Sequence, residues 1–216
     1  QVRVIILTGA GEQAFSAGAD ISEFDKYRST STKAKEYAEA FDSTTNALDS
    51  ISKPTISMIK GYCVGGGCEL SLATNCRIAA SDSHFGIPAA RLGIVIGYRE
   101  TQRLVNLVGS GNAQYMLLSA QLLDAHEALR IGLVNQVLPL EELEEFTYTL
   151  ANNIADHSPL SYQAQKKILK TIVENPSLNN LTQEEKDMPF SVFDTEDFQE
   201  GAKAFMGKRN PRFRNR

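Results

Sequence analysis

Three consecutive glycines after a predicted buried strand constrain this chain more than any other feature. Residues 55–59 are typical of a strand, and Gly65, Gly66 and Gly67 lead from it into a helix-like run that carries Glu69. Glycine lets the backbone turn tightly and approach a ligand with no side chain in between. The N–H groups of a first helical turn would then face a ligand above Gly66. The segment predicts an oxyanion site beside an acid or base, and the alternative is a plain strand-to-helix turn with a solvated glutamate.

Strand-like and helix-like runs alternate along the first two thirds of the chain, which predicts an α/β architecture. From about Pro139 onward, apolar residues recur at helical spacing with charges between them, which predicts an all-helical end. Strands are expected at 4–7, 55–59 and 76–79, and helices at 32–51, 104–108, 113–119, 140–154 and 160–173.

Composition excludes several classes of protein. The 22 Lys and Arg residues against 26 Asp and Glu give a net charge of −4, which argues against nucleic acid as a partner. No apolar stretch approaches the roughly 20 residues of a membrane span, so no membrane partner is expected.

The three cysteines have no metal-ligand spacing and are expected as free thiols. His84, His126 and His157 are scattered along the chain, so no metal site is predicted. A reducing compartment, the cytoplasm by default, is expected.

A second loop of small residues makes the glycine turn more specific. Residues 14–21, Ala-Phe-Ser-Ala-Gly-Ala-Asp-Ile, follow the first predicted strand and a Gly9-Ala10-Gly11 turn. Two such loops, each directly after a strand, can direct two backbone N–H groups at one carbonyl oxygen, as an oxyanion hole requires.

Five phrases of the sequence resemble the crotonase superfamily, the enoyl-CoA hydratase and isomerase family. They are AFSAGADI, KPTISMIKGYCVGGGCELSLATNCRIA, FGIPAARLGI, TQRL and EGAKAFMGKR, and the resemblance covers essentially the whole chain. It implies an α/β fold, a crotonase-like spiral of repeated ββα units at 1–140 and a C-terminal helical segment at 141–216 for oligomerisation and CoA contact. An N-terminal part of the family fold is expected to be missing, and a homotrimer or homohexamer is expected.

The resemblance also implies a set of site residues. The backbone N–H groups of Ala19 and Gly66 would hold the thioester oxygen of an acyl-CoA substrate, with about 3 to 4 kcal/mol from each donor. Glu69 would handle the proton or the water, and Asp20 would support its loop through hydrogen bonds to backbone N–H groups. The remaining expected substrate-binding residues are Ala17, Gly18, Asp20, Ile21, Gly65, Tyr98 and Lys208, the last of them for the CoA phosphates.

Two departures from the family pattern bear on the chemistry. Family hydratases use a second glutamate in a phrase like FGxPE, and here Ala89 stands in its place. The family's PGxGGTQRL phrase reads IGYRETQRL, so that Tyr98, Arg99 and Glu100 replace small residues. Each of the three is a candidate for the missing acid or for a contact to a polar acyl group. A surface loop beside a helix start is the alternative.

The function expected from these features is lyase chemistry of fatty acid metabolism, the hydration or dehydration of a 2-enoyl-CoA through an oxyanion-stabilised thioester enolate. No cofactor is expected apart from the coenzyme A of the substrate. An enoyl-CoA isomerase and an enzyme like methylmalonyl-CoA decarboxylase are alternatives, since each needs at most one proton carrier. A catalytically weak acyl-CoA-binding protein is a third reading, favoured if no acid reaches the space opposite Glu69.

Overall fold

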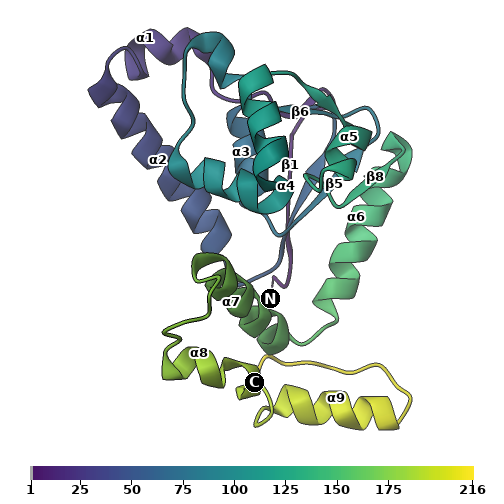
Figure 1. The fold of residues 1–216 in the computed structure, drawn as a ribbon. Coiled ribbons are helices and arrows are strands. Elements are labelled where there is room, and N and C mark those ends of the chain that lie inside the picture. Colours follow the sequence, from purple (N-terminus) through teal and green to yellow (C-terminus); the bar gives the residue numbers. More distant parts are fainter. Residues whose placement is uncertain (1) are drawn as a thin grey trace. The chain divides into compact units, whose positions relative to one another are not determined.

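The computed structural model describes residues 2–216 and divides them into two compact units (Figure 1). The core unit comprises 6–51 and 55–147, and the C-terminal unit comprises the residues up to Ile5, 52–54 and 148–216. Within 2–216, none of the helices has both the length and the apolar character needed to cross a membrane.

Two four-stranded sheets form the centre of the fold, with strand orders β1-β3-β5-β8 and β2-β4-β6-β7. Neighbouring strands are parallel in the pairs β3–β5, β5–β8, β2–β4 and β4–β6, and antiparallel in β6–β7. The strands of the first sheet are β1 (Ile5–Thr8), β3 (Thr55–Ile59), β5 (Cys76–Ala80) and β8 (Gln136–Leu138). Those of the second sheet are β2 (Ala14–Ser16), β4 (Tyr62–Val64), β6 (His84–Gly86) and β7 (Leu123–Asp124).

From β1 to β6, consecutive strands alternate between the two sheets, and a helix follows each pair. β1 and β2 lead into α2, β3 and β4 lead into α3, and β5 and β6 lead into α4. This is the ββα repeat that the resemblance implied, so the predicted fold class is confirmed. Because each repeat ends its second strand in the same sheet, the loops after β2, β4 and β6 are neighbours in space.

The core unit contains helices as well as the two sheets. The helices are η1 (Ile21–Glu23), α1 (Phe24–Tyr27), α2 (Ser31–Ser50), α3 (Gly66–Leu72), η2 (Ala89–Leu92), α4 (Tyr98–Ser119), α5 (Ala125–Arg130) and the start of α6 (Leu140–Ala155). The two helices expected at 104–108 and 113–119 form one element, α4, with a break at Gly109, whose φ is 73°. Leu143 and Thr147 of α6 are buried, and the compact core unit extends to Thr147.

The glycine turn holds α3 against β2. A Cβ atom at Gly67 would collide with the carbonyl oxygen of Ser16 and would lie 2.6 Å from the Ser16 Cβ, so only glycine fits there. Cys63 and Cys68 on either side of the turn are buried free thiols, as expected, and Cys76 is a partly buried one. The close packing of the Gly67 backbone against Ser16 fixes the position of the N-terminus of α3.

The C-terminal unit contains the end of α6 and the remaining helices. These are α7 (Pro159–Glu174), α8 (Gln183–Asp187), η3 (Met188–Phe190) and α9 (Glu196–Met206). Ser158 occupies the N-cap position of α7 without a capping hydrogen bond from its side chain, and its hydroxyl donates to Asp197 Oδ2 at 3.1 Å. The Asp197 carboxylate is 2% exposed and also accepts hydrogen bonds from the N–H groups of Arg214 and Asn215, which ties the chain end to α9.

Candidate active site

A cavity of about 330 Å³ opens in the core unit where the loops after β2 and β4 meet the segment before α4. Its wall is largely apolar, and its charged lining residues are Arg28, Asp42, Glu69 and Glu100. The small residues of the two predicted loops form one side of it. The two segments that were predicted separately therefore line one space.

The two loops touch through their backbones. Gly18 has a φ of 96°, which side-chain-bearing residues rarely adopt. A Cβ atom there would lie 3.2 Å from the Gly66 nitrogen and 3.1 Å from the Val64 carbonyl oxygen. The absence of a side chain at Gly18 thus lets the loop after β2 approach the Gly66 peptide closely.

Two backbone N–H groups at this junction are unused by the protein. Among residues 2–216, no acceptor receives a hydrogen bond from the N–H of Ala19 or of Gly66. The neighbouring Gly65 N–H, in contrast, donates to the Gly86 carbonyl oxygen at 2.8 Å. Polar groups in a partly buried place need a partner, and a ligand oxygen in the cavity would supply one for both donors.

Glu69 presents a carboxylate to the same cavity from the first turn of α3. Burial raises its pKa from 4.5 to about 7, and repulsion from Glu100 and Asp42 adds to this, whereas Arg28 acts in the opposite direction. No residue in the described part of the chain donates a hydrogen bond to this carboxylate. Glu69 is therefore a group that can take up or release a proton near neutral pH.

The raised pKa makes stability depend on pH. The folded protein holds the Glu69 proton more tightly than the unfolded chain does, so stability is lost as pH rises from about 4.5 to about 7. The full loss corresponds to about 3 kcal/mol. We expect Glu69→Gln to be more stable than the wild type above pH 7, and the difference to shrink toward pH 5, in urea titrations of both proteins. An equal difference at both pH values would contradict the raised pKa.

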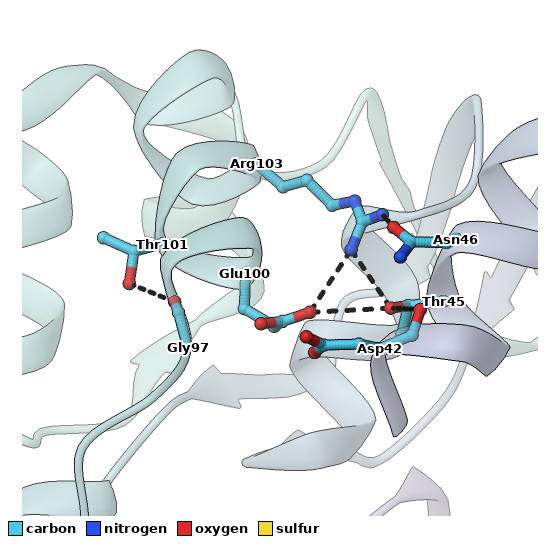
Figure 2. A network of polar contacts seen from close by, with 7 residues as sticks. All are labelled: Asp42, Thr45, Asn46, Gly97, Glu100, Thr101 and Arg103. Atoms are coloured by element: carbon cyan, nitrogen blue, oxygen red, sulfur yellow. Dashed lines mark hydrogen bonds and ion pairs between the residues drawn. The ribbon is translucent and has the colours of Figure 1, made fainter. Parts of the chain in front are cut away.

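Glu100 is the second buried glutamate of the cavity. It is 1% exposed, and its Oε1 lies 3.3 Å from Arg103 Nη1 and 3.5 Å from the Thr45 hydroxyl (Figure 2). Arg103 also donates to Thr45 Oγ1 at 3.1 Å and to Asn46 Oδ1 at 2.8 Å, so it connects α4 to α2. Glu100 Oε2 is not part of this network and lies next to Gly97, another lining residue.

The three candidates for the missing acid differ in position. Ala89 lines the cavity, as the position of the family's second glutamate should, and brings no carboxylate there. Tyr98 is 96% exposed and Arg99 is exposed, and neither lines the cavity. Glu100 does line it, because it lies one helical turn beyond Gly97 on the buried face of α4.

The other predicted residues are distributed as follows. Asp20 does not line the cavity, and its Oδ1 accepts hydrogen bonds from the Ser22 N–H at 2.9 Å and the Ser22 hydroxyl at 2.7 Å, in agreement with a loop-supporting role. Lys208 belongs to the C-terminal unit. The predicted residues that line the cavity are Ala17, Gly18, Ala19, Ile21, Gly65, Gly66 and Glu69.

Sequence reasoning missed two charged residues of the cavity, Arg28 and Asp42. Arg28 ends the short helix α1, and Asp42 lies in the middle of α2. Neither belongs to a recognisable motif, and the helical periodicity of α2 does not distinguish a cavity-facing position from a solvent-facing one. Only the tertiary packing of α1 and α2 around the cavity identifies them.

A broader hollow of about 1520 Å³ lies within the C-terminal unit, lined mostly by polar side chains. Two of its charged residues pair with each other, since Arg209 donates hydrogen bonds of 2.6 and 2.8 Å to Glu200. Within residues 2–216, no cluster of three or more His, Cys, Asp or Glu side chains is arranged to hold a metal ion. The cavity with Glu69 is the site where unpaired donors and a perturbed acid coincide.

Comparisons with known proteins show the family to which the chain belongs. The family model described as enoyl-CoA hydratase/isomerase matches residues 1–216. The chain is 36% identical to a short-chain-enoyl-CoA hydratase of Clostridium acetobutylicum and 35% identical to a 2,3-dehydroadipyl-CoA hydratase of Escherichia coli, each over the whole chain and 82% of the relative. A crystal structure of an enoyl-CoA hydratase/carnithine racemase from Magnetospirillum magneticum superposes with a TM-score of 0.95 at 32% identity, covering the whole chain and 79% of that structure.

Proposed function

Because the chain belongs to the enoyl-CoA hydratase/isomerase family of the crotonase superfamily, we propose that it is a lyase that adds water to the double bond of a 2-enoyl-CoA and catalyses the reverse dehydration. One observation carries this proposal. Two unpaired backbone N–H groups, of Ala19 and Gly66, line the same cavity as a glutamate whose pKa is about 7.

The chemistry builds negative charge at the thioester oxygen. When water attacks the β-carbon of a 2-enoyl thioester, the electrons of the double bond move toward the carbonyl and form an enolate. The N–H groups of Ala19 and Gly66 would donate to that oxygen and stabilise it most when its charge is greatest. Preorganised donors in a partly dry cavity are effective because they need no reorientation during the reaction.

Glu69 would move the proton in this scheme. Its carboxylate accepts a proton from water as the water oxygen bonds to the β-carbon, and the same proton is then delivered to the α-carbon of the enolate. Glu100, fixed by Arg103 and Thr45, would hold the water through its other oxygen. Glu69 thus keeps the place of the family's first glutamate, and Glu100, anchored by its ion pair with Arg103, takes the part of the second one, which is missing at Ala89.

The pH dependence of hydration tests this division of roles. Glu69 must begin unprotonated, so kcat/KM for crotonyl-CoA should rise with pH through an apparent pKa of about 7 and level off above it. Glu100→Gln removes a charge that raises the Glu69 pKa, and should move this limb to lower pH. The measurement is a pH–rate profile of wild type and variant.

Ala89→Glu is the matched comparison, because it restores the family's second glutamate in the same cavity. Combined with Glu100→Gln in one protein, Ala89→Glu should restore part of any hydration rate that Glu100→Gln alone has lost. If the rising part of the pH–rate profile lies at the same pH in Glu100→Gln as in the wild type, and Ala89→Glu restores no hydration rate, then Glu100 does not act in this site.

A double-bond isomerase is the second candidate, because isomerisation needs only one proton carrier. Glu69 can serve as that carrier, since no described residue donates a hydrogen bond to its carboxylate. Mass spectrometry of products from 2-enoyl-, 3-enoyl- and methylmalonyl-CoA distinguishes the reactions, because only hydration adds the mass of water. Tight CoA binding without turnover of any thioester would favour the non-enzymatic reading.

The remaining features of the proposal concern coenzyme A and assembly. The substrate supplies the only coenzyme, and Lys208 meets its phosphates. A homotrimer or homohexamer in the cytoplasm is the proposed state. Exposed apolar side chains of the C-terminal unit support an assembly, among them Leu169, Ile172, Phe190, Phe205 and Met206.

A further inference from the structure

We propose that Arg28 makes the cavity selective for acyl groups that end in a carboxylate. This inference rests on the proposed function, because it assigns the substrate class of the same site. The α1 helix ends at Tyr27, and the Arg28 side chain lines the cavity that Glu69 also lines. Among the described lining residues, Arg28 is the only cation.

The Arg28 guanidinium is held in place by aromatic rings. Its central carbon lies 3.8 Å from the centroid of the Tyr37 ring and 5.0 Å from that of Phe24. Both aromatic residues line the cavity too. Stacking of this kind orients the planar guanidinium and leaves its N–H edge free to bind.

The donors of this guanidinium have no acceptor in the part of the chain that the structure describes. Within residues 2–216, Arg28 forms no ion pair, and its side chain donates no hydrogen bond. Arg103, in contrast, is tied to Glu100, Thr45 and Asn46. Asp42 and Glu69 lie in the same cavity, yet neither is close enough to Arg28 to form a salt bridge.

A substrate with an apolar acyl end would drive water out of the cavity and leave the guanidinium unpaired, which is costly. An acyl group that ends in a carboxylate would pair with it, in the two-pronged geometry that arginine favours. The apolar wall, with Ile21, Phe41 and Ile87, suits the methylene groups between thioester and carboxylate. Glu69 and Asp42 repel a substrate carboxylate in the cavity. Such a carboxylate therefore improves binding only when it contacts Arg28 directly.

The test compares the binding of adipoyl-CoA and hexanoyl-CoA, whose acyl chains are equally long and which cannot be hydrated. Isothermal calorimetry should give tighter binding of adipoyl-CoA to the wild type. Arg28→Met should weaken adipoyl-CoA binding by about 100-fold while changing hexanoyl-CoA binding by less than about threefold. Arg28→Lys should give an intermediate loss, because it keeps the charge without the planar fork.

Arg130→Met is the matched control, since Arg130 pairs with Glu127 on the exposed surface of α5 and does not line the cavity. It should leave both affinities unchanged. An unchanged affinity ratio in Arg28→Met, or an equal loss for both thioesters and for free CoA, would overturn the inference. Turnover of 2-hexenoyl-CoA and 2,3-dehydroadipyl-CoA is measured separately: no turnover of either contradicts the hydratase proposal and leaves the binding comparison to decide the role of Arg28.

Discussion

Replacing Glu69 by glutamine should reduce the hydration of crotonyl-CoA by about 10²- to 10⁴-fold, the range that general acid–base catalysis supplies. Glutamine fills nearly the same volume and still accepts a hydrogen bond, so water and thioester should bind as before. What is lost is the group that carries the proton from water to the α-carbon. The measurement is kcat and KM for crotonyl-CoA above pH 7, where Glu69 is ionised.

Glu145→Gln is the control for this substitution. Glu145 is an exposed residue of α6 and does not line the cavity, so its replacement should leave kcat and KM within about twofold of the wild type. Unchanged turnover in Glu69→Gln would remove Glu69 from the mechanism, whatever its pKa. A rise in KM at constant kcat would instead indicate that Glu69 serves binding alone.

Replacing Gly66 by proline should reduce hydration by about 10²- to 10³-fold, the typical cost of losing one oxyanion donor. Gly66 is the first residue of α3, where proline is tolerated in a helix because its missing N–H has no helical acceptor. The substitution therefore removes the donor with little effect on the helix. The expected result is a fall in kcat with nearly unchanged affinity for free CoA.

Gly66→Ala is the matched variant, because alanine keeps the N–H. A Cβ atom at this position would lie 3.7 Å from the Phe41 ring, an ordinary contact, so activity should stay within about tenfold of the wild type. Equal activity of the alanine and proline variants would exclude the Gly66 N–H as an oxyanion donor. Thermal unfolding of both variants checks that the core unit remains folded.

Long periodic segments were predictable from sequence, and short ones were not. The strand at 55–59 and the helices near 32–51, 140–154 and 160–173 agree with the structure to within one or two residues, because burial or helical spacing repeats along them. β6, β7 and β8 are only two or three residues long and carry no such repeat. Their pairing depends on neighbouring strands far away in the chain.

The candidate site divides in the same way. The glycine turn and the Ala14–Ile21 loop were predicted, because a tight backbone approach demands residues without side chains. Tyr98, Arg99 and Glu100 remained equal candidates, because neighbouring residues of a helix start point in different directions. The buried face of α4 selected Glu100 for the cavity and left Tyr98 exposed.

By itself the sequence determined the family and the two loops whose backbone donors and glutamate make a hydratase-like site, because each depends on local residue types at fixed spacing, and the ββα repeat was implied by the family resemblance. Tertiary structure alone decided that Glu100 lies in the cavity with Glu69, that burial raises the Glu69 pKa, and that Arg28 enters the same space with unpaired donors. Burial and charge proximity arise from segments distant in the chain, and they exist only once α2, α3 and α4 have packed together.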